Sequence, residues 1–198
     1  MKKSIYKYLK KNYHFSKKMI IKKSITDEIW FEKLQVEASK IGARVHLLKL
    51  RVDYTKPFND AVMAGGPQTS TDSCVFKVFD KYQTIEKNMI IDETIILLNW
   101  EKGYESYQKA VEWGLSKGLK KTTYHVPFTI GEQFPNINYE IGSNPMYIIE
   151  TTGGLFGDYA NCSYCVWWYN LNRTSDLYYQ GCSAVLCGSW FAFRKKQI

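Results

Sequence analysis

Four of the five cysteines of this chain lie in the segment CSYCVWWYNLNRTSDLYYQGCSAVLC, residues 162–187. They form two close pairs. Two residues separate Cys162 from Cys165, and four residues separate Cys182 from Cys187. Four thiolates in two such pairs can hold Zn²⁺ tetrahedrally, and two neighbouring thiols can exchange as a redox pair. The remaining interpretation is that these cysteines are small, soft side chains that fill apolar space.

The spacing gives only limited support to a metal site. The first pair has the usual zinc-knuckle spacing, but the second is longer, and no glycine follows Cys165 to turn the knuckle. The residues after Cys165 favour a strand, in which Cys162 and Cys165 would point to opposite faces. Zinc held by the four cysteines, or a redox pair among them, is therefore an alternative hypothesis, and the leading one needs no cofactor.

No other catalytic constellation stands out in the sequence. The three histidines, His14, His46 and His125, are scattered, and His125 stands where a helix is expected to begin. The chain has neither a G-x-S-x-G nucleophile motif nor a glycine-rich phosphate loop before a helix. We therefore predict that the chain is not an enzyme.

The composition around the cysteines resembles that of an antibody paratope. Residues 157–189 contain five Tyr, four Ser, three Asn and three Gly, with only three charged residues. Tyrosine offers a large rigid contact area, while Ser, Gly and Asn adapt their hydrogen bonds to a partner. An exposed face that binds a protein or glycan is therefore expected, although an aromatic core would have a similar composition. The residues expected on this face are Tyr169, Asn170, Asn172, Arg173, Tyr178 and Tyr179.

The net charge of +8 belongs to the N-terminus alone. Residues 1–23 hold nine lysines and no acidic residue, which leaves 18 basic against 19 acidic residues in the rest of the chain. On a helix, most of these lysines fall opposite an apolar arc. This arm, residues 1–23, could anchor the chain to an anionic membrane or to nucleic acid, or it could lie on its own domain as a solvated helix or tail.

The remaining pattern predicts an α+β protein with one globular domain, residues 24–198. A small α/β lead-in, residues 24–85, contains a helix, a strand and a short helix, followed by a loop and the short strand CVFKVF. A strand with a possible bend at Asp92 and Glu93 comes next. Helices over YESYQKAVEWGLSKG and HVPFTIGEQFPN and strands over PMYIIETT, CVWWY and SWFAFRK complete the domain.

The order of elements in residues 86–198 resembles the C-type-lectin-like fold. The segments that carry the resemblance are AVEWG, KGLKKTTYHVPFTIG, YCVWWYN and WFAFRKK, the last ending in an aromatic residue and arginine as that fold often does. The resemblance implies a display surface in this part of the chain, as in bacterial proteins diversified by retroelements. It does not imply calcium-dependent sugar binding, because EQFPN and WYN lack the clustered carboxylates of a Ca²⁺ site.

Two narrower resemblances accompany this one. Cys182 and Cys187 have the same gap as the paired copper-binding cysteines of formylglycine-generating enzymes, which share the fold, and this implies a copper oxidase as a further alternative. The segments TKPFNDAVMAGG and WFAFR are similar to those of a diverse group of bacterial proteins without an assigned activity.

The sequence also bears on location. It has no apolar run near the roughly 20 residues of a membrane span, and no apolar region follows the basic N-terminus as in a secretory signal. We therefore expect a cytoplasmic protein without a transmembrane segment. Its leading predicted function is a non-enzymatic binding module, ahead of a cysteine-metal protein and of anchoring through the arm.

Overall fold

The computed structural model describes residues 27–78, 89–100, 106–153, 159–180 and 188–196. The chain divides into two compact parts, residues 1–41 and 42–198. The predicted arm, residues 1–23, and its boundary lie outside the described residues. In the first part, residues 27–39 are helical, as predicted, and the chain leaves this helix at Gly42, whose φ of 69° suits glycine.

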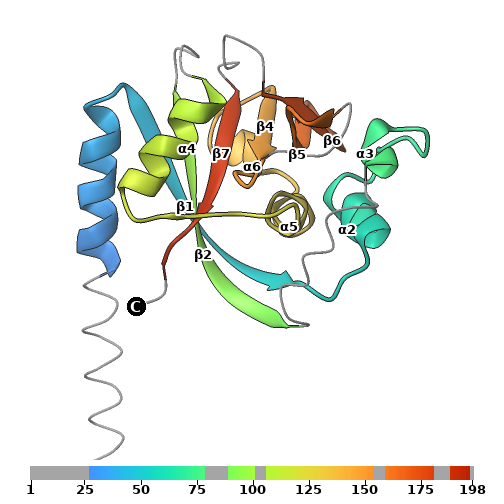
Figure 1. Ribbon diagram of the computed structural model, residues 1–198, viewed down its shortest axis with the longest axis horizontal. Coiled ribbons are helices and arrows are strands. Elements are labelled where there is room, and N and C mark those ends of the chain that lie inside the picture. The colour runs from blue at the N-terminus through green and yellow to red at the C-terminus, as the bar shows by residue number, and fades with distance from the viewer. Residues whose placement is uncertain (1–26, 79–88, 101–105, 154–158, 181–187, 197–198) are drawn as a thin grey trace, which may run out of the picture. The chain divides into compact units, whose positions relative to one another are not determined.

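The second part contains a seven-stranded sheet and helices, which confirms the α+β class (Figure 1). The strands follow the order β1-β2-β7-β4-β5-β6, and β3 pairs with β7. The β4–β7 pair is parallel and the other pairs are antiparallel. The strands are β1 (Ala43–Asp53), β2 (Ile90–Trp100), β3 (Lys120–Lys121), β4 (Met146–Ile149), β5 (Cys162–Tyr169), β6 (Asn172–Tyr179) and β7 (Ser189–Arg194).

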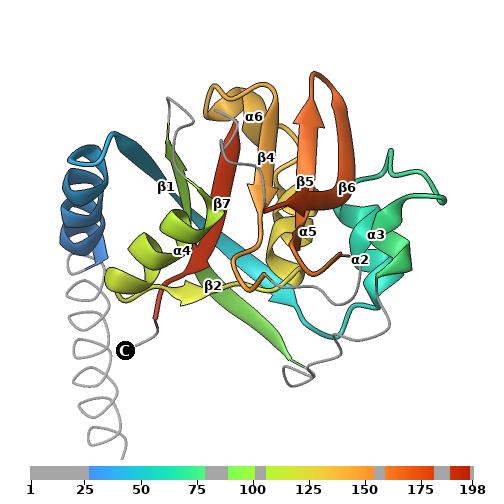
Figure 2. The same cartoon turned by 45° about the horizontal axis from the view of Figure 1, so that its top comes forward.

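The helices of this part are short. They are α2 (Phe58–Gly65), α3 (Cys74–Lys77), α4 (Tyr107–Ser116), α5 (His125–Gln133) and α6 (Ile137–Glu140). Of these, α5 is buried along most of its length, and Figure 1 views it end-on between α2 and the sheet. In contrast, α4 covers the other face of the sheet. There, the backbone at Gly114 lies against the ring of Phe193 of β7. Figure 2 shows α4 in front of β7, with α5 farther back.

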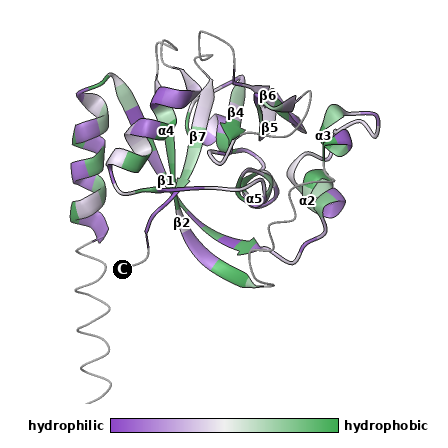
Figure 3. Cartoon of the chain, viewed as in Figure 1, coloured by the Kyte–Doolittle hydropathy of each residue, from purple (hydrophilic) through white to green (hydrophobic). Residues whose placement is uncertain are grey.

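Strands β1 and β2 pair without interruption from Ala43–Trp100 to Asp53–Ile90. Leu48, Leu50 and Val52 are buried on one face of β1, as their alternation predicts. Asp92 and Glu93, where a bend was possible, both pair within the ladder. In Figure 3 the end of β1 and the start of β2 carry both hydrophilic and hydrophobic residues, as expected where one face of a sheet is solvated.

The expected strand CVFKVF is also wrong, since residues 74–77 form α3. The Ser73 Oγ accepts a hydrogen bond from the Val75 backbone N–H at 3.3 Å, which is a helix N-cap contact. Only Val75 of this short helix is buried. A local cap therefore overrides the strand preference of the β-branched residues here.

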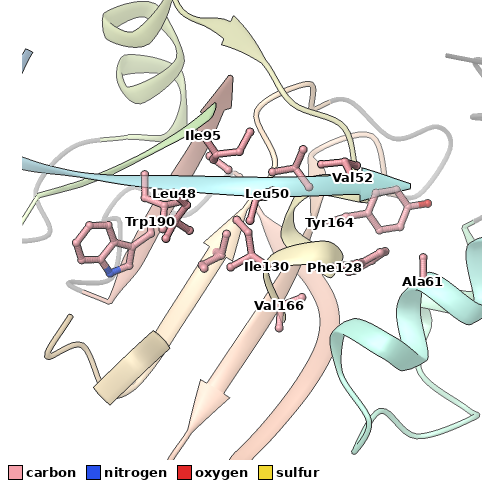
Figure 4. Close-up of a cluster of buried hydrophobic side chains, with 14 of the residues drawn as sticks. Leu48, Leu50, Val52, Ala61, Ile95, Phe128, Ile130, Tyr164, Val166 and Trp190 are labelled. Atoms are coloured by element: carbon pink, nitrogen blue, oxygen red, sulfur yellow. The ribbon is translucent and has the colours of Figure 1, made fainter. Parts of the chain in front are cut away.

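One hydrophobic core joins the inner face of the sheet to α2 and α5 (Figure 4). Strand β5 contributes its even-numbered side chains to this core, from Cys162 to Trp168. The close-up shows residues of β1, α5 and β5 gathered around one interior, among them Leu50, Ile130, Phe128, Tyr164 and Val166. The core therefore fixes the face of β5 that points inward, and the odd-numbered side chains must point the other way.

Candidate recognition site

The β5–β6 hairpin ends in an exposed turn. Tyr169 pairs with Asn172, so that Asn170 and Leu171 make the two-residue turn. Asn170 has a φ of 54°, a left-handed conformation that asparagine tolerates better than most residues and that tight hairpin turns require. The sequence Asn-Leu-Asn thus sets the turn, and the turn sets the register of the two strands.

Hydrogen bonds from neighbouring segments hold this tip. The Asn170 backbone N–H donates to Oδ1 of Asn144 at 3.0 Å, and Nδ2 of Asn144 donates to Oδ1 of Asn170 at 3.1 Å. Nδ2 of Asn138, in α6, donates to the Asn170 carbonyl at 3.3 Å. Next to the turn, Nε1 of Trp168 donates to the Pro135 carbonyl at 3.1 Å. The tip is therefore tied to α6 and to the segment before β4.

Two exposed side chains at the tip are apolar or aromatic. Leu171 is 83% exposed, and Tyr169 beside it is 50% exposed. Tyr139 of α6, the residue after the Asn138 that binds the turn, is 51% exposed. Aromatic anchors of this kind dominate the energetics of protein interfaces. This segment combines a fixed backbone with an apolar surface that water covers in the free chain.

A row of aromatic rings leads from the tip along the outer face of the sheet. The ring centroids of Tyr147 and Trp167 are 5.8 Å apart with 13° between the planes. Those of Trp167 and Tyr169 are 6.1 Å apart with 26° between the planes. Strand β6 places Asn172 and Thr174 opposite Tyr169 and Trp167 on the same face. The row thus offers ring surfaces next to polar hydrogen-bonding groups.

The structure brings together three of the six predicted binding residues. Tyr169, Asn170 and Asn172 are exposed at the tip. Asn170 also has a structural role, because its amide holds the turn. Tyr179 is 54% exposed but lies at the far end of β6, opposite Cys162.

The prediction for Tyr178 is wrong, because it is only 7% exposed. It pairs with Ser163, so its side chain leaves the sheet on the same face as the odd-numbered residues of β5, and there it is covered. Arg173 is partly buried and lies on the face of Tyr179, opposite to that of Tyr169 and Asn172. The six residues therefore do not form a single face, because side chains alternate along β6.

The sequence analysis missed Leu171, Tyr139 and Tyr147. Leu171 could have been found, since it stands between two turn-forming asparagines. Tyr147 comes from β4, and strand pairing brings it to Trp167. Tyr139 follows Asn138 of α6, which bonds to the turn.

The two described cysteines of the C-terminal segment do not share a site. Cys162 faces the core, whereas Cys165 is buried on the opposite face of β5, paired with Asp176. A single ion cannot be ligated by both thiols of a regular strand in this arrangement. Burial raises the pKa of both thiols, which disfavours the thiolate that metal binding or redox exchange requires. Cys182 and Cys187 lie outside the described residues.

A buried polar network lies where β4 ends and β5 begins. The Glu150 Oε1 accepts a hydrogen bond from the Tyr164 backbone N–H at 3.1 Å. Tyr107 of α4 donates its hydroxyl to the Glu150 carbonyl at 3.3 Å, and Nε2 of Gln180 donates to Ser163 Oγ at 2.7 Å. Burial raises the pKa of Glu150 to about 8, so this side chain is mainly a neutral acid at pH 7. The network joins α4 to both strands.

His125 is another buried titratable group. It lies in the first turn of α5, and its ring centroid is 4.9 Å from that of Tyr54 and 4.0 Å from that of Tyr124. Burial lowers the pKa of His125 to about 4, so the imidazole is neutral at pH 7. This side chain packs within an aromatic cluster, in the first turn of the helix that the sequence predicts to begin there.

Comparison of the chain with protein-family models, with curated proteins and with solved structures gives no match. The C-type-lectin-like body therefore stays a prediction.

Within the described ranges, no group of three or more His, Cys, Asp or Glu side chains could hold a metal ion. Among the helices that the structure describes, none has the length and apolar character needed to cross a membrane.

Glu150 and His125 give a testable dependence of stability on pH. The folded state holds the Glu150 proton up to about pH 8, whereas the unfolded carboxyl loses it near 4.5, so stability falls as pH rises between these values. The folded state excludes the His125 proton down to about pH 4, so stability falls as pH drops below 6.5. Between pH 6.5 and 8 we expect the free energy of unfolding to decrease by up to about 1.4 kcal/mol per pH unit.

Urea denaturation of the native chain and of Glu150→Gln at pH 6.5 and 8 checks this expectation. The amide cannot ionise, so the variant should lose much less stability across this interval. Glu112→Gln, an exposed site on α4, serves as the control and should follow the native chain. Equal slopes for the native chain and Glu150→Gln would contradict the assignment.

Proposed function

We propose that this chain is a non-enzymatic binding module that recognises a partner through the β5–β6 hairpin tip. The observation that carries the proposal is Leu171, which is 83% exposed on a turn whose backbone is hydrogen-bonded by Asn144 and Asn138. Scattered exposed leucines need no explanation. An exposed leucine flanked by a half-exposed tyrosine on a fixed turn is a different case, because it provides a preorganised apolar anchor.

Preorganisation increases affinity because the ordering cost has been met before the partner arrives. The reciprocal amide contact between Asn144 and Asn170 fixes the turn, and Trp168 anchors the preceding strand through Pro135. Burial of Leu171 in a partner would remove most of its side-chain surface from water, worth about 1.5–3 kcal/mol. Tyr169 and Tyr139 would add contact area around it.

The exposed leucine favours a protein as the partner, because an aliphatic side chain fits an apolar pocket between side chains. The aromatic row of Tyr147, Trp167 and Tyr169 supports a second candidate, a glycan. Near-parallel rings offer flat apolar surface, and Asn172 and Thr174 on the same face could bond to hydroxyl groups. The two candidates use adjacent but different residues, and substitutions can separate them.

The proposal includes a C-type-lectin-like body over residues 86–198. The order of elements supports it: α4 and α5 precede β4, and the last strand, β7, returns between β2 and β4 and ends at Phe193 and Arg194.

A cytoplasmic location is also part of the proposal. The free thiols of Cys74, Cys162 and Cys165 support it, because thiols stay reduced there.

The hairpin proposal predicts that Leu171→Asp weakens partner binding at least tenfold. A photo-crosslinkable residue at position 139 identifies the partner, which is then purified, and the Kd is measured for each variant. An aspartate at the centre of an apolar contact removes the burial energy of the leucine, and its charge must be desolvated. A loss of about 1.4 kcal/mol or more in binding free energy is therefore expected, which is tenfold in Kd.

An array of immobilised oligosaccharides, probed with the native chain and with Trp167→Ala, tests the glycan candidate.

Leu115→Asp is the matched control, because Leu115 is also an exposed leucine, 46% exposed on α4. It should leave the Kd unchanged. If every purified partner binds Leu171→Asp as tightly as the native chain, and no oligosaccharide binding depends on Trp167, the hairpin is not the recognition site.

A second proposal concerns the arm. Its nine lysines among residues 1–23, without an acidic residue, support binding to an anionic membrane or to nucleic acid. We expect the full chain to bind phosphatidylserine vesicles or duplex DNA, with an affinity that falls as salt rises, and the chain without residues 1–23 to lose this binding. Equal binding by both chains would overturn the proposal.

A further inference from the structure

The aromatic row on the outer face of the sheet has a carboxylate beside it. Asp176 of β6 is exposed, and it pairs with Cys165 of β5. Trp167 stands two residues further along β5, on the same face as Cys165, so Asp176 and Trp167 are diagonal neighbours. Diagonal neighbours of an antiparallel pair lie about 7–8 Å apart, within reach of long side chains. One side chain of a partner can therefore contact both residues.

The Asp176 carboxylate is oriented by its own strand. Its Oδ1 accepts a hydrogen bond from the Leu177 backbone N–H at 2.8 Å. Among the described residues, no basic side chain forms an ion pair with Asp176. Burial raises the pKa of Tyr147, and electrostatic interaction with Cys165 and with Asp176 adds to this rise. The carboxylate therefore acts on the rings of the row, and its remaining lone pairs can accept donors from a partner.

The strands around Asp176 provide no positive charge on this face. Residues 146–193 contain β4, β5 and β6, and Arg173 is their only basic residue. Arg173 pairs with Trp168, and its side chain lies on the face opposite to that of Asp176, because side chains alternate along β6. The three strands that carry the row and Asp176 thus present aromatic rings and a negative charge without a cation of their own.

We propose that this face binds an arginine side chain of the partner protein, with the guanidinium over the aromatic row and paired with Asp176. A guanidinium is planar, stacks on ring faces and donates two parallel hydrogen bonds to a carboxylate. The near-parallel rings of Trp167 and Tyr169 offer such faces, and Tyr169 is 50% exposed. An acidic group would be repelled by Asp176, and an aliphatic side chain would leave this carboxylate without a counter-ion.

The inference rests on the proposed function, because it adds a second contact for the partner that the hairpin tip binds. Tyr169 belongs to both the tip and the row, next to Leu171 in neither strand's interior but at the turn. Along β6, four residue steps separate Asn172 at the turn from Asp176, which is about 13 Å of strand. A short extended segment of a partner can therefore cover Leu171 and place an arginine at Asp176.

Selection from a phage library of random dodecapeptides tests the inference, with the native full-length chain as the bait. We expect the selected peptides to share an arginine together with an apolar residue that contacts Leu171. Each selected peptide is then synthesised, and its Kd is measured at low and at high salt. Salt should weaken the binding, because an exposed ion pair is screened.

Two substitutions separate the parts of the contact. Asp176→Asn keeps an oxygen for the Leu177 amide and removes the charge, so we expect it to weaken peptide binding about tenfold at low salt. Tyr169→Leu keeps an apolar side chain and removes the ring, and the lost cation–π contact should weaken binding about two- to fivefold. A peptide with citrulline in place of arginine should bind the native chain and Asp176→Asn with similar affinity.

Asp72→Asn is the matched control. Asp72 is an exposed aspartate before α3 and belongs to none of the strands. This variant should keep the native affinity and the native salt dependence. Both asparagine variants should keep the native urea midpoint, so that a change in Kd reports the contact and not the folding of the chain.

Leu171→Asp distinguishes this inference from the proposed function. Peptides that lose affinity in Leu171→Asp but bind Asp176→Asn as tightly as the native chain would support the hairpin site and overturn the arginine contact. Peptides that depend on Asp176 and not on Leu171 would do the reverse.

Three further results would overturn the inference. One is that no peptide is selected, or that the selected peptides lack arginine. Another is an equal loss of affinity in Asp176→Asn and Asp72→Asn, which would indicate diffuse attraction by surface charge. The third is oligosaccharide binding that Trp167→Ala abolishes and Asp176→Asn leaves intact, which would assign the aromatic row to a glycan.

Discussion

The close approach of three backbone segments constrains the outer half of the sheet. A Cβ atom at Gly66 would lie 2.0 Å from the Ser175 backbone nitrogen of β6, and one at Gly131 of α5 would lie 2.2 Å from the Gly65 carbonyl oxygen. No side chain fits at either glycine, so α2 lies directly on β6 and against α5. Hydrogen bonds complete the contact: Ser175 Oγ donates to the Val62 carbonyl at 2.7 Å, and the Ser175 backbone N–H donates to Thr69 Oγ1 at 2.8 Å.

This contact connects the packing to the proposed recognition site. Strand β6 ends the order of paired strands, and an edge strand with open hydrogen-bonding groups tends to move or to pair with another chain. Here Gln68 donates its backbone N–H to the Arg173 carbonyl at 3.2 Å, and residues near α2 cover part of that edge. With β6 held from this side and the turn held through Asn144, Leu171 can remain exposed without a mobile backbone beneath it.

Sequence patterns predicted the elements whose periodicity is strong. Leu48, Leu50 and Val52 of β1, and Ala110 and Gly114 of α4, are buried as their spacing indicated. Strand β6 was not predicted, because NRTSDLYY mixes polar and apolar residues without a clean alternation. The burial of Tyr178 depends on the register of the hairpin, because a shift of one residue would move its side chain to the other face of the sheet. That register is set by the turn at Asn170 together with Asn144, a contact between residues distant in sequence.

The most direct test of this account is the stability of Gly66→Ala. Gly66 has a φ of −138°, which alanine adopts without strain, so the substitution probes only the contact with β6. We predict a loss of about 1–3 kcal/mol in the free energy of unfolding, with faster hydrogen exchange of the β6 amides, because a methyl group must separate packed backbones. Met63→Ala, at a 39% exposed site on α2, should stay within about 0.5 kcal/mol of the native chain. Native stability and native exchange in Gly66→Ala would contradict the account.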